Sequence, residues 1–257
     1  MSCLLELKKV MLNYHTDSGE TLALKDISIC IDKEEFVAIV GPSGCGKTTI
    51  LSLIAGILKP SSGEILLNGE PVNTKTGKIG YMFQHDQLFP WRTIWQNVKL
   101  GLEIQHDKSS ESKAYMLNLL EKYGLIDFKN NYPQELSGGM RQRVALIRTL
   151  VLQPNILLLD EPFSALDYQT RQTVVDDVSN IIRAENKTSI LVTHDIGEAV
   201  SMADRVIVLS KRPAVIKAEF KIPFSREGTP SNKKTNPQFK FFKDKVWKEL
   251  NEDEKTA

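Results

Sequence analysis

Residues 41–48 combine three glycines with a lysine and a threonine at a spacing that suits phosphate chemistry. They match the pattern G-x-x-x-x-G-K-[ST] at every fixed position. Glycine backbone can wrap closely around phosphate oxygens, and a helix N-terminus then directs N–H donors at them. Lys47 can reach the β- and γ-phosphates, and the Thr48 hydroxyl can bind Mg²⁺. We therefore expect a nucleotide site here rather than a glycine turn without a ligand.

Two carboxylates, Asp160 and Glu161, follow the apolar run 156–159. Such a run predicts a buried strand that delivers both acids to the edge of a site. In phosphoryl transfer a metal ion needs an anionic anchor, and the attacking water needs orientation and a proton acceptor. Asp160 suits the metal and Glu161 suits the water. Capping of the following helix is the simpler alternative, which the phosphate pattern upstream disfavours.

A third group, Ser137, Gly138 and Gly139, opens a run of helical periodicity that stops before Pro154. A serine hydroxyl and bare glycine amides at a helix start form a second anion-binding cradle. Taken alone, the three residues are better explained as an ordinary helix cap.

Strand-like and helical runs alternate along the chain, which favours an α/β fold with a mainly parallel sheet. The phosphate pattern lies between an expected strand at 36–40 and an expected helix at 48–58. The N-terminal part is an antiparallel β region with a turn at Asp17, Ser18 and Gly19. Asn68 and Gly69 indicate a hairpin. Further strands are expected at 65–67, 79–83, 155–160, 189–194 and 206–209, helices at 168–184 and 144–152, and an inserted helical subdomain at about 95–152.

The bulk composition is that of an ordinary globular protein, with 41% hydrophobic and 25% charged residues and a formal net charge of +1. The charge gives no argument for a nucleic-acid partner. No apolar run approaches the ~20 residues that cross a bilayer, and the N-terminus lacks the layout of a signal peptide. Three scattered cysteines predict a reducing compartment and no disulfide framework.

The segment from Pro223 onward is more polar, and 229–234 is expected to be loop. Phe239, Phe242, Val246 and Leu250 then share one face of a short helix that carries lysines elsewhere. Such a helix can contact a membrane surface or dock on its own domain. The expected organisation is a catalytic domain at 1–222 and a short C-terminal tail at 223–257.

The ordered motifs together resemble the ATPases of the ATP-binding-cassette (ABC) family. Leu136–Met140 is similar to the family's signature motif. Gln84, just after an expected strand, resembles the Q-loop glutamine. Residues 164–167 resemble the D-loop, and His194 resembles the switch histidine. Tyr14 is a plausible platform for the adenine ring. The resemblance covers roughly residues 4–209 and shows no departure at a catalytic position.

The resemblance implies a role for each matching residue. The ligands are ATP and Mg²⁺. The implied catalytic residues are Glu161, His194, Gln84 and Lys47, and the implied metal-binding residues are Thr48, Gln84 and Asp160. The implied nucleotide-binding residues are Tyr14, Gly41, Pro42, Ser43, Gly44, Cys45, Gly46, Lys47, Thr48, Thr49, Ser137, Gly138, Gly139 and Asp167.

Members of this family act as head-to-tail dimers, so the resemblance implies a second ATPase subunit, most simply an identical chain. Each ATP is then held between the phosphate loop of one chain and Ser137 and Gly139 of the other. The family also implies an integral-membrane permease and, indirectly, an extracytoplasmic solute-binding protein. The chain would be peripheral, on the cytoplasmic face of the membrane.

Residues 88–91 and 140–143 are similar to ATPases that import nitrate, sulfonates, taurine or related small solutes. In the family, the surface after Gln84 receives a coupling helix of the permease. Leu88, Phe89, Pro90 and Trp91 would suit such a groove if exposed, and the alternative is that they pack internally. An exporter ATPase, or a cassette ATPase of DNA repair or translation, remains the alternative function.

Overall fold

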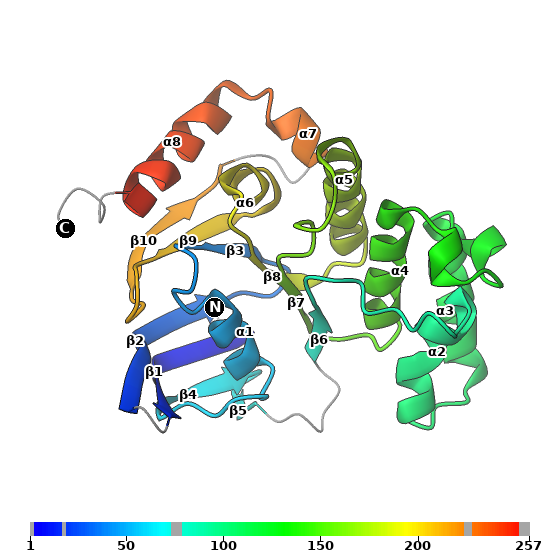
Figure 1. Cartoon of the computed structure of the whole chain (residues 1–257), viewed down its shortest axis with the longest axis horizontal. Helices are drawn as coiled ribbons and strands as arrows, with labels where there is room; N and C mark the ends of the chain where they lie inside the picture. The colour runs from blue at the N-terminus through cyan, green and yellow to red at the C-terminus, as the bar shows by residue number, and fades with distance from the viewer. Residues whose placement is uncertain (1–2, 17–18, 73–78, 224–227, 252–257) are drawn as a thin grey trace.

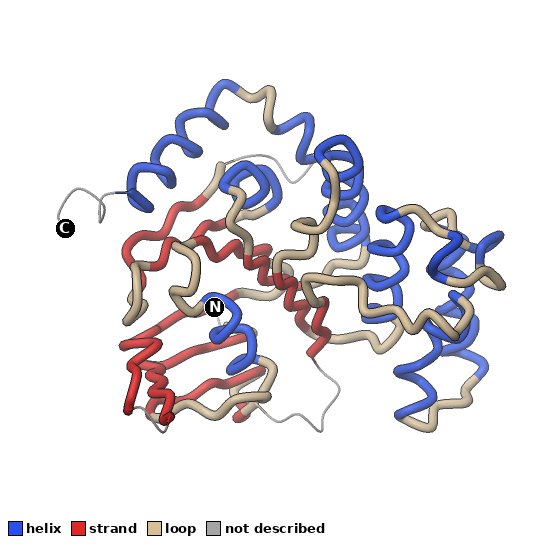
Figure 2. The backbone as a smooth tube through the Cα atoms, viewed as in Figure 1, coloured by secondary structure: helices blue, strands red, loops and turns tan. Residues whose placement is uncertain are grey.

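The computed structural model describes residues 3–16, 19–72, 79–223 and 228–251. Its strands form two sheets, with helices packed between and around them (Figures 1 and 2). The expected α/β architecture is therefore confirmed. The strands are β1 (Leu5–Thr16), β2 (Gly19–Ile31), β3 (Phe36–Val40), β4 (Ser62–Leu67), β5 (Glu70–Pro71), β6 (Ile79–Met82), β7 (Ile156–Asp160), β8 (Thr188–Val192), β9 (Arg205–Leu209) and β10 (Ile216–Lys221).

The larger sheet has the strand order β10-β9-β3-β8-β7-β6, in which only β10 is antiparallel to its neighbour. Every residue of β3, β7 and β8 is buried. Strands covered on both faces can be apolar throughout, which explains the continuous aliphatic runs in the sequence. Because β3, β6, β7 and β8 are parallel, the residues that follow them meet at one edge of the sheet.

Alternate residues of this sheet belong to two different cores. Val37, Ile39, Leu158 and Ile190 pack with α1 (Lys47–Ile54) and the antiparallel sheet. Residues one step along, such as Ala38 and Leu159, pack with the helices on the other face. Those helices are α2 (Ile94–Ile104), α3 (Ser110–Lys122), α4 (Gly138–Leu150), α5 (Tyr168–Ala184), α6 (Ile196–Met202) and α8 (Pro237–Asn251).

The smaller sheet has the order β2-β1-β4-β5 and is antiparallel. The β4–β5 hairpin is confirmed, because Leu67 pairs with Glu70 and both Asn68 (φ 54°) and Gly69 (φ 78°) are left-handed, as a tight hairpin turn requires. Of the predicted turn at 17–19, Asp17 and Ser18 lie outside the described residues.

Cys3 and Cys30 form a disulfide, with their Cα atoms 5.5 Å apart. The expectation of no disulfide was therefore wrong, and the cysteine pattern does not support a reducing compartment. In the β1–β2 register Glu6 lies opposite Cys30, and Cys3 lies two residues before the start of β1, so the paired strands bring the two cysteines close together. Spacing along the sequence does not reveal such a register.

Helix α1 is shorter than the expected helix at 48–58. It ends at Ile54, and Gly56 adopts a left-handed φ of 71°, which ends the helix. Ile57 is consequently 61% exposed rather than on a buried helical face. The helical spacing of the apolar residues alone did not locate this end.

A helical lobe lies between β6 and β7, as expected for 95–152. It contains α2, α3 and α4 together with 3-10 turns at Ile126–Phe128 and Pro133–Glu135. Figure 1 shows this lobe in green beside the end of the parallel sheet. In the loop before α2, Leu88 is buried, so the alternative of internal packing holds for this residue, whereas Pro90 and Trp91 are exposed.

The C-terminal segment folds back onto the larger sheet and α6. Helix α8 packs against α6, β9 and β10, with Val246 fully buried and Phe239, Phe242 and Leu250 against the core. The apolar face of the predicted helix is thus docked on its own chain rather than free for a membrane. The expected loop at 229–234 contains a short helix, α7 (Pro230–Lys233), because Thr229 caps its N-terminus.

In the described parts of the chain, the structure contains no helix with the length and apolarity needed to span a bilayer.

Replacement of Val246 by alanine tests whether α8 is an integral part of the core. Loss of two buried methyl groups should lower the free energy of unfolding by about 2 kcal/mol. The exposed Lys243 offers a matched control on the same helix, and Lys243→Ala should change stability by less than about 0.5 kcal/mol. Urea denaturation measures both, and equal effects would contradict the docking of α8.

Candidate active site

Four motifs meet at the carboxyl edge of the parallel sheet. The phosphate loop follows β3, Gln84 follows β6, Glu161 follows β7 and His194 follows β8. Pairing in the sheet places these strands side by side in the order β3-β8-β7-β6. In open parallel sheets this edge is where ligands bind.

The glycines of the phosphate loop are required by its backbone. Gly44 and Gly46 have φ values of 72° and 121°, which side-chain-bearing residues rarely adopt. A Cβ on Gly46 would also lie 2.8 Å from Leu24 Cδ2. Cys45 is buried within the loop, and burial raises the pKa of its thiol, so it remains protonated at neutral pH.

Lys47 is the first residue of α1 and is 7% exposed. Its Nζ donates to the carbonyl oxygens of Gly41 (2.9 Å) and Pro42 (3.1 Å). The ammonium is therefore held inside the loop, where the N-terminus of α1 also provides free backbone N–H groups. This arrangement fits a ligand with several negative charges.

Thr48 and Asp160 come from different motifs and are directly hydrogen-bonded. The Thr48 hydroxyl donates to Asp160 Oδ1 at 3.0 Å, and the Tyr81 hydroxyl donates to Oδ2 at 3.1 Å. Burial raises the pKa of Asp160, and the two hydrogen bonds oppose that shift. A hydroxyl and a carboxylate side by side are hard oxygen ligands of the kind Mg²⁺ prefers, so the donor set fits that ion.

Glu161 has a left-handed backbone, with φ 45°, which is costly for a residue with a side chain. Hydrogen bonds hold it there: its N–H donates to Val192 O, and its carbonyl accepts from the N–H and hydroxyl of Ser164. Its Oε2 lies 3.1 Å from Nδ1 of His194. The strained backbone thus directs the carboxylate toward the histidine that follows the neighbouring strand.

A buried carboxyl lies beside this histidine. Glu198 is 6% exposed and accepts a hydrogen bond from the Thr193 hydroxyl at 2.7 Å. Its N–H donates to Asp195 Oδ1, which caps α6. Burial, opposed by the hydrogen bond from Thr193, raises the pKa of Glu198 to about 7. The residues on both sides of His194 are therefore anchored.

Two further predicted residues lie near the phosphate loop or at the same edge. The Tyr14 hydroxyl is 3.2 Å from Thr49 Oγ1, which brings the first strand to the start of α1. Gln84 is exposed directly after β6. These positions agree with a nucleotide that extends from the phosphate loop toward β1.

The Ser137 group lies at the start of α4. Ser137 caps α4, with its hydroxyl accepting from Met140 N–H at 3.3 Å. A Cβ on Gly139 would lie 2.6 Å from Val174 of α5, so a larger residue would displace the helix tip. Asp167 caps α5 and is exposed, and hydrogen bonds from Thr170 lower its pKa. Ser137 and Asp167 therefore each cap a helix of their own chain.

These two groups belong to different faces of the parallel sheet. Helix α1 packs in the core shared with the antiparallel sheet, whereas α4 packs in the core on the opposite face. Direct hydrogen bonds therefore link Tyr14 to the phosphate loop, the loop to Asp160, and Glu161 to His194, whereas Ser137, Gly138 and Gly139 begin the helix α4 on the opposite face of the sheet.

Sequence reasoning missed Tyr81 and Glu198. Tyr81 reaches Asp160 because β6 and β7 pair with Tyr81 opposite Leu158. The signal available in the sequence was a tyrosine near the end of a strand that precedes the Q-loop glutamine. Glu198 had a weaker signal, an acid four positions after the switch histidine.

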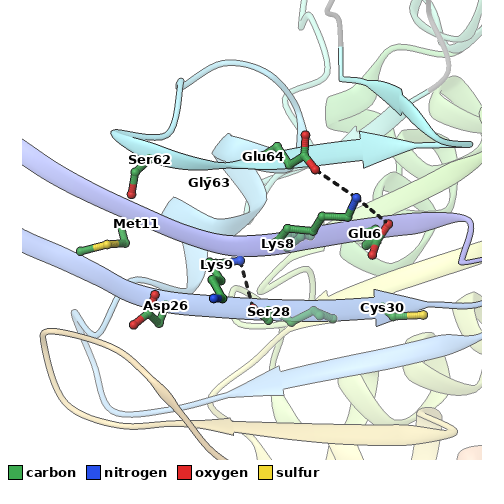
Figure 3. A pocket seen from close by; sticks show the side chains of 12 residues that line it. Glu6, Lys8, Lys9, Met11, Asp26, Ser28, Cys30, Ser62, Gly63 and Glu64 are labelled. Atoms are coloured by element: carbon green, nitrogen blue, oxygen red, sulfur yellow. Dashed lines mark hydrogen bonds and ion pairs between the residues drawn. The ribbon is translucent and has the colours of Figure 1, made fainter.

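A separate open groove of about 900 Å³ lies along the antiparallel sheet (Figure 3). Lys8 there pairs with Glu64 at 3.0 Å and with Glu6 at 3.5 Å. Lys9 N–H donates to the Ser28 hydroxyl. The groove shares no residue with the phosphate loop, and its charged side chains largely neutralise one another.

The fold and the edge site define a P-loop nucleoside-triphosphatase. The model of the "ABC transporter" family matches residues 24–164. The chain belongs to this family.

Three relatives extend over most of the chain. An uncharacterized ABC transporter ATP-binding protein, YtlC of Bacillus subtilis, is 47% identical over 98% of this chain and 97% of its own length. The taurine import ATP-binding protein TauB of Jannaschia sp. is 39% identical over 91% of this chain and 89% of its own length. The nitrate import ATP-binding protein NrtD of Synechocystis sp. is 43% identical over 89% of this chain and 88% of its own length.

The structure also resembles one chain of a solved structure. The ATP-binding cassette MJ0796, described as a dimer in a post-hydrolysis state bound to ADP and Pi, superimposes with a TM-score of 0.71 and 33% identity. The match covers 86% of this chain and all of that chain. The phosphate loop and helical lobe described here thus belong to a cassette of known architecture.

Stability should depend on pH through Glu198. Its folded pKa of about 7 exceeds the ordinary value of 4.5, so the folded state binds more protons than the unfolded state between these values. The free energy of unfolding should therefore fall as pH rises from about 4.5 to 7, through this group. In Glu198→Gln, which keeps an acceptor for Thr193, this contribution should vanish. Urea unfolding of both proteins at pH 5 and pH 8 measures it, and identical pH dependence would contradict the burial of an ionisable Glu198.

Proposed function

We propose that this chain is the ATP-hydrolysing subunit of an ABC importer for a small solute, with the residues at the carboxyl edge of its parallel sheet as the catalytic site. One observation carries most of the catalytic assignment: a phosphate loop, the Thr48–Asp160 pair and the Glu161–His194 pair converge at that edge. Membership of the family makes the chain an ATP-binding ATPase.

Binding of the nucleotide is assigned to the phosphate loop and Tyr14. The loop N–H groups and Lys47 would hold the β- and γ-phosphates, and Tyr14 would stack on the adenine ring. Thr48 and Asp160, with Gln84, would hold Mg²⁺, which when bound neutralises phosphate charge. Lys47 would exchange its bonds to two loop carbonyls for phosphate oxygens.

Hydrolysis is assigned to Glu161 and His194. The Glu161 carboxylate accepts a proton from the attacking water, and the water is oriented toward the γ-phosphorus. His194 lies 3.1 Å from that carboxylate, so it can hold the carboxylate in place and present its other ring nitrogen to the γ-phosphate. Hydrogen bonds to Val192 and Ser164 hold the backbone of Glu161 in place. The bond from Thr193 to Glu198 anchors the residue before His194.

The opposite placement of α1 and α4 supports a head-to-tail dimer. Within one chain, Ser137, Gly138 and Gly139 lie on the other face of the sheet from α1, so they would act on the nucleotide held by a second copy. Asp167 would lie in the same interface. Donors from two chains around one triphosphate would make ATP a bridge that hydrolysis removes.

A membrane permease is the second partner proposed. Trp91 is 70% exposed and contacts Phe89, with ring centroids 5.1 Å apart, in the loop that follows Gln84. Exposed aromatic residues suit an apolar docking surface. The chain would then lie on the cytoplasmic face of the membrane, and a solute-binding protein would deliver the solute outside. The names of relatives, taurine and nitrate import proteins, support a small solute of the nitrate, sulfonate or taurine kind.

Glu161→Gln should leave ATP binding intact and slow hydrolysis at least ~100-fold, because glutamine cannot accept the proton. The variant should also accumulate as an ATP-bound dimer on gel filtration. Glu34→Gln, at an exposed turn, is the control and should hydrolyse ATP at the wild-type rate. Normal turnover in Glu161→Gln would exclude this residue as the base.

Trp91→Ala should reduce recovery of the membrane subunits with the tagged cassette about tenfold or more, as expected for an exposed aromatic at the centre of an interface. Its ATPase rate as an isolated protein should be unchanged. Ile104→Ala, equally exposed at 69% in the same lobe, is the matched control. Equal recovery with both variants would place the docking surface elsewhere.

A further inference from the structure

The loop between β6 and α2 is fastened to the helix that carries Ser137. Arg148 of α4 donates from its two terminal nitrogens to the carbonyl oxygens of Gln87 and Asp86, each at 2.7 Å. Arg141 of α4 donates from Nε to Asp86 Oδ2 at 3.0 Å. Two consecutive loop residues are thus held by two arginines that lie on the same face of α4, about two turns apart.

The Arg141 guanidinium has a second partner at the start of its own helix. Its NH1 donates to Leu136 O at 2.8 Å, and Leu136 directly precedes Ser137. A guanidinium is planar and rigid, so its two hydrogen bonds fix their acceptors relative to each other. The positions of Asp86 and of the Ser137 tip are therefore linked through one group.

The other end of the same loop is anchored to α2. Asn97 is fully buried; its Oδ1 accepts from Phe89 N–H at 2.7 Å, and its Nδ2 lies within 3.1 Å of the carbonyl oxygens of Phe89, Arg92 and Thr93. Asp86 Oδ1 also accepts from Leu88 N–H. The loop is thus bonded to the helical lobe at both ends and should move with that lobe.

We propose that Arg141 is a positioning residue that couples the surface around Trp91 to the Ser137–Gly139 tip through Asp86. A partner that displaces residues 86–91 would then shift the tip as one body, and would change how it meets the nucleotide of the second chain. The proposal rests on the proposed function, because it assigns a role to the tip in the dimer.

A double-mutant cycle tests this coupling without the membrane partner. Asp86→Asn, Arg141→Gln and the double variant are compared with wild type for ATPase kcat and KM, and in the Glu161→Gln background for ATP-dependent dimerisation. Each single change should lower kcat about tenfold, the size of one charged hydrogen bond. The affinity of the monomer for a fluorescent ATP analogue should stay within about twofold, since the phosphate loop is untouched.

Coupling through one pair predicts that the double variant is no worse than the more affected single variant. Asp86→Glu, which keeps the carboxylate, should retain most activity. Glu103→Gln breaks the Arg92–Glu103 pair, 2.7 Å long and in the same lobe, and should leave kcat unchanged. Additive losses, loss of monomer nucleotide affinity, or an equal loss with Glu103→Gln would overturn the proposal. A wild-type chain that neither hydrolyses ATP nor forms the ATP dimer would instead contradict the proposed function itself.

Discussion

The parallel pairing of β6, β7, β8 and β3 is the constraint on which the site depends. Because these strands run the same way in one sheet, their carboxyl ends coincide, and four short motifs that are distant in sequence become neighbours. The Thr48–Asp160 bond requires β3 and β7 to run the same way, and the Glu161–His194 pair requires the same of β7 and β8. The two cores on either side of the sheet hold this alignment in place.

The same sheet also separates the phosphate loop, on the face of α1, from the Ser137–Gly139 tip, on the face of α4. In the proposed function, one chain binds the nucleotide with its phosphate loop, and the Ser137–Gly139 tip acts on the nucleotide of a second copy. The helical lobe connects that tip to the loop after Gln84 by side-chain hydrogen bonds rather than by the sheet. Catalytic chemistry and its control by partners thus use different parts of the fold.

Features that depend only on residues close together in the sequence could be predicted from it. The phosphate loop, the acids after β7 and the helix at 168–184 needed only local patterns, because strand and helix periodicity and cap residues lie within a few positions of each other. The Cys3–Cys30 disulfide and the exposure of Ile57 were not predicted, and the sequence left open whether Leu88 is buried. The first depends on strand register, the second on where a helix ends, and the third on packing against another element. Tyr81 was missed for a related reason, since its partner belongs to a neighbouring strand.

At position 161 the backbone conformation favours glycine, whereas the contact with His194 requires a carboxylate. Glycine would adopt φ 45° without steric cost and would relieve the local strain, but it would remove the carboxylate beside His194. Selection for a more robust fold and selection for a faster enzyme therefore favour different residues at this position. Libraries of variants screened for thermal tolerance alone should drift toward inactive sequences here, while the rest of the sheet edge is retained.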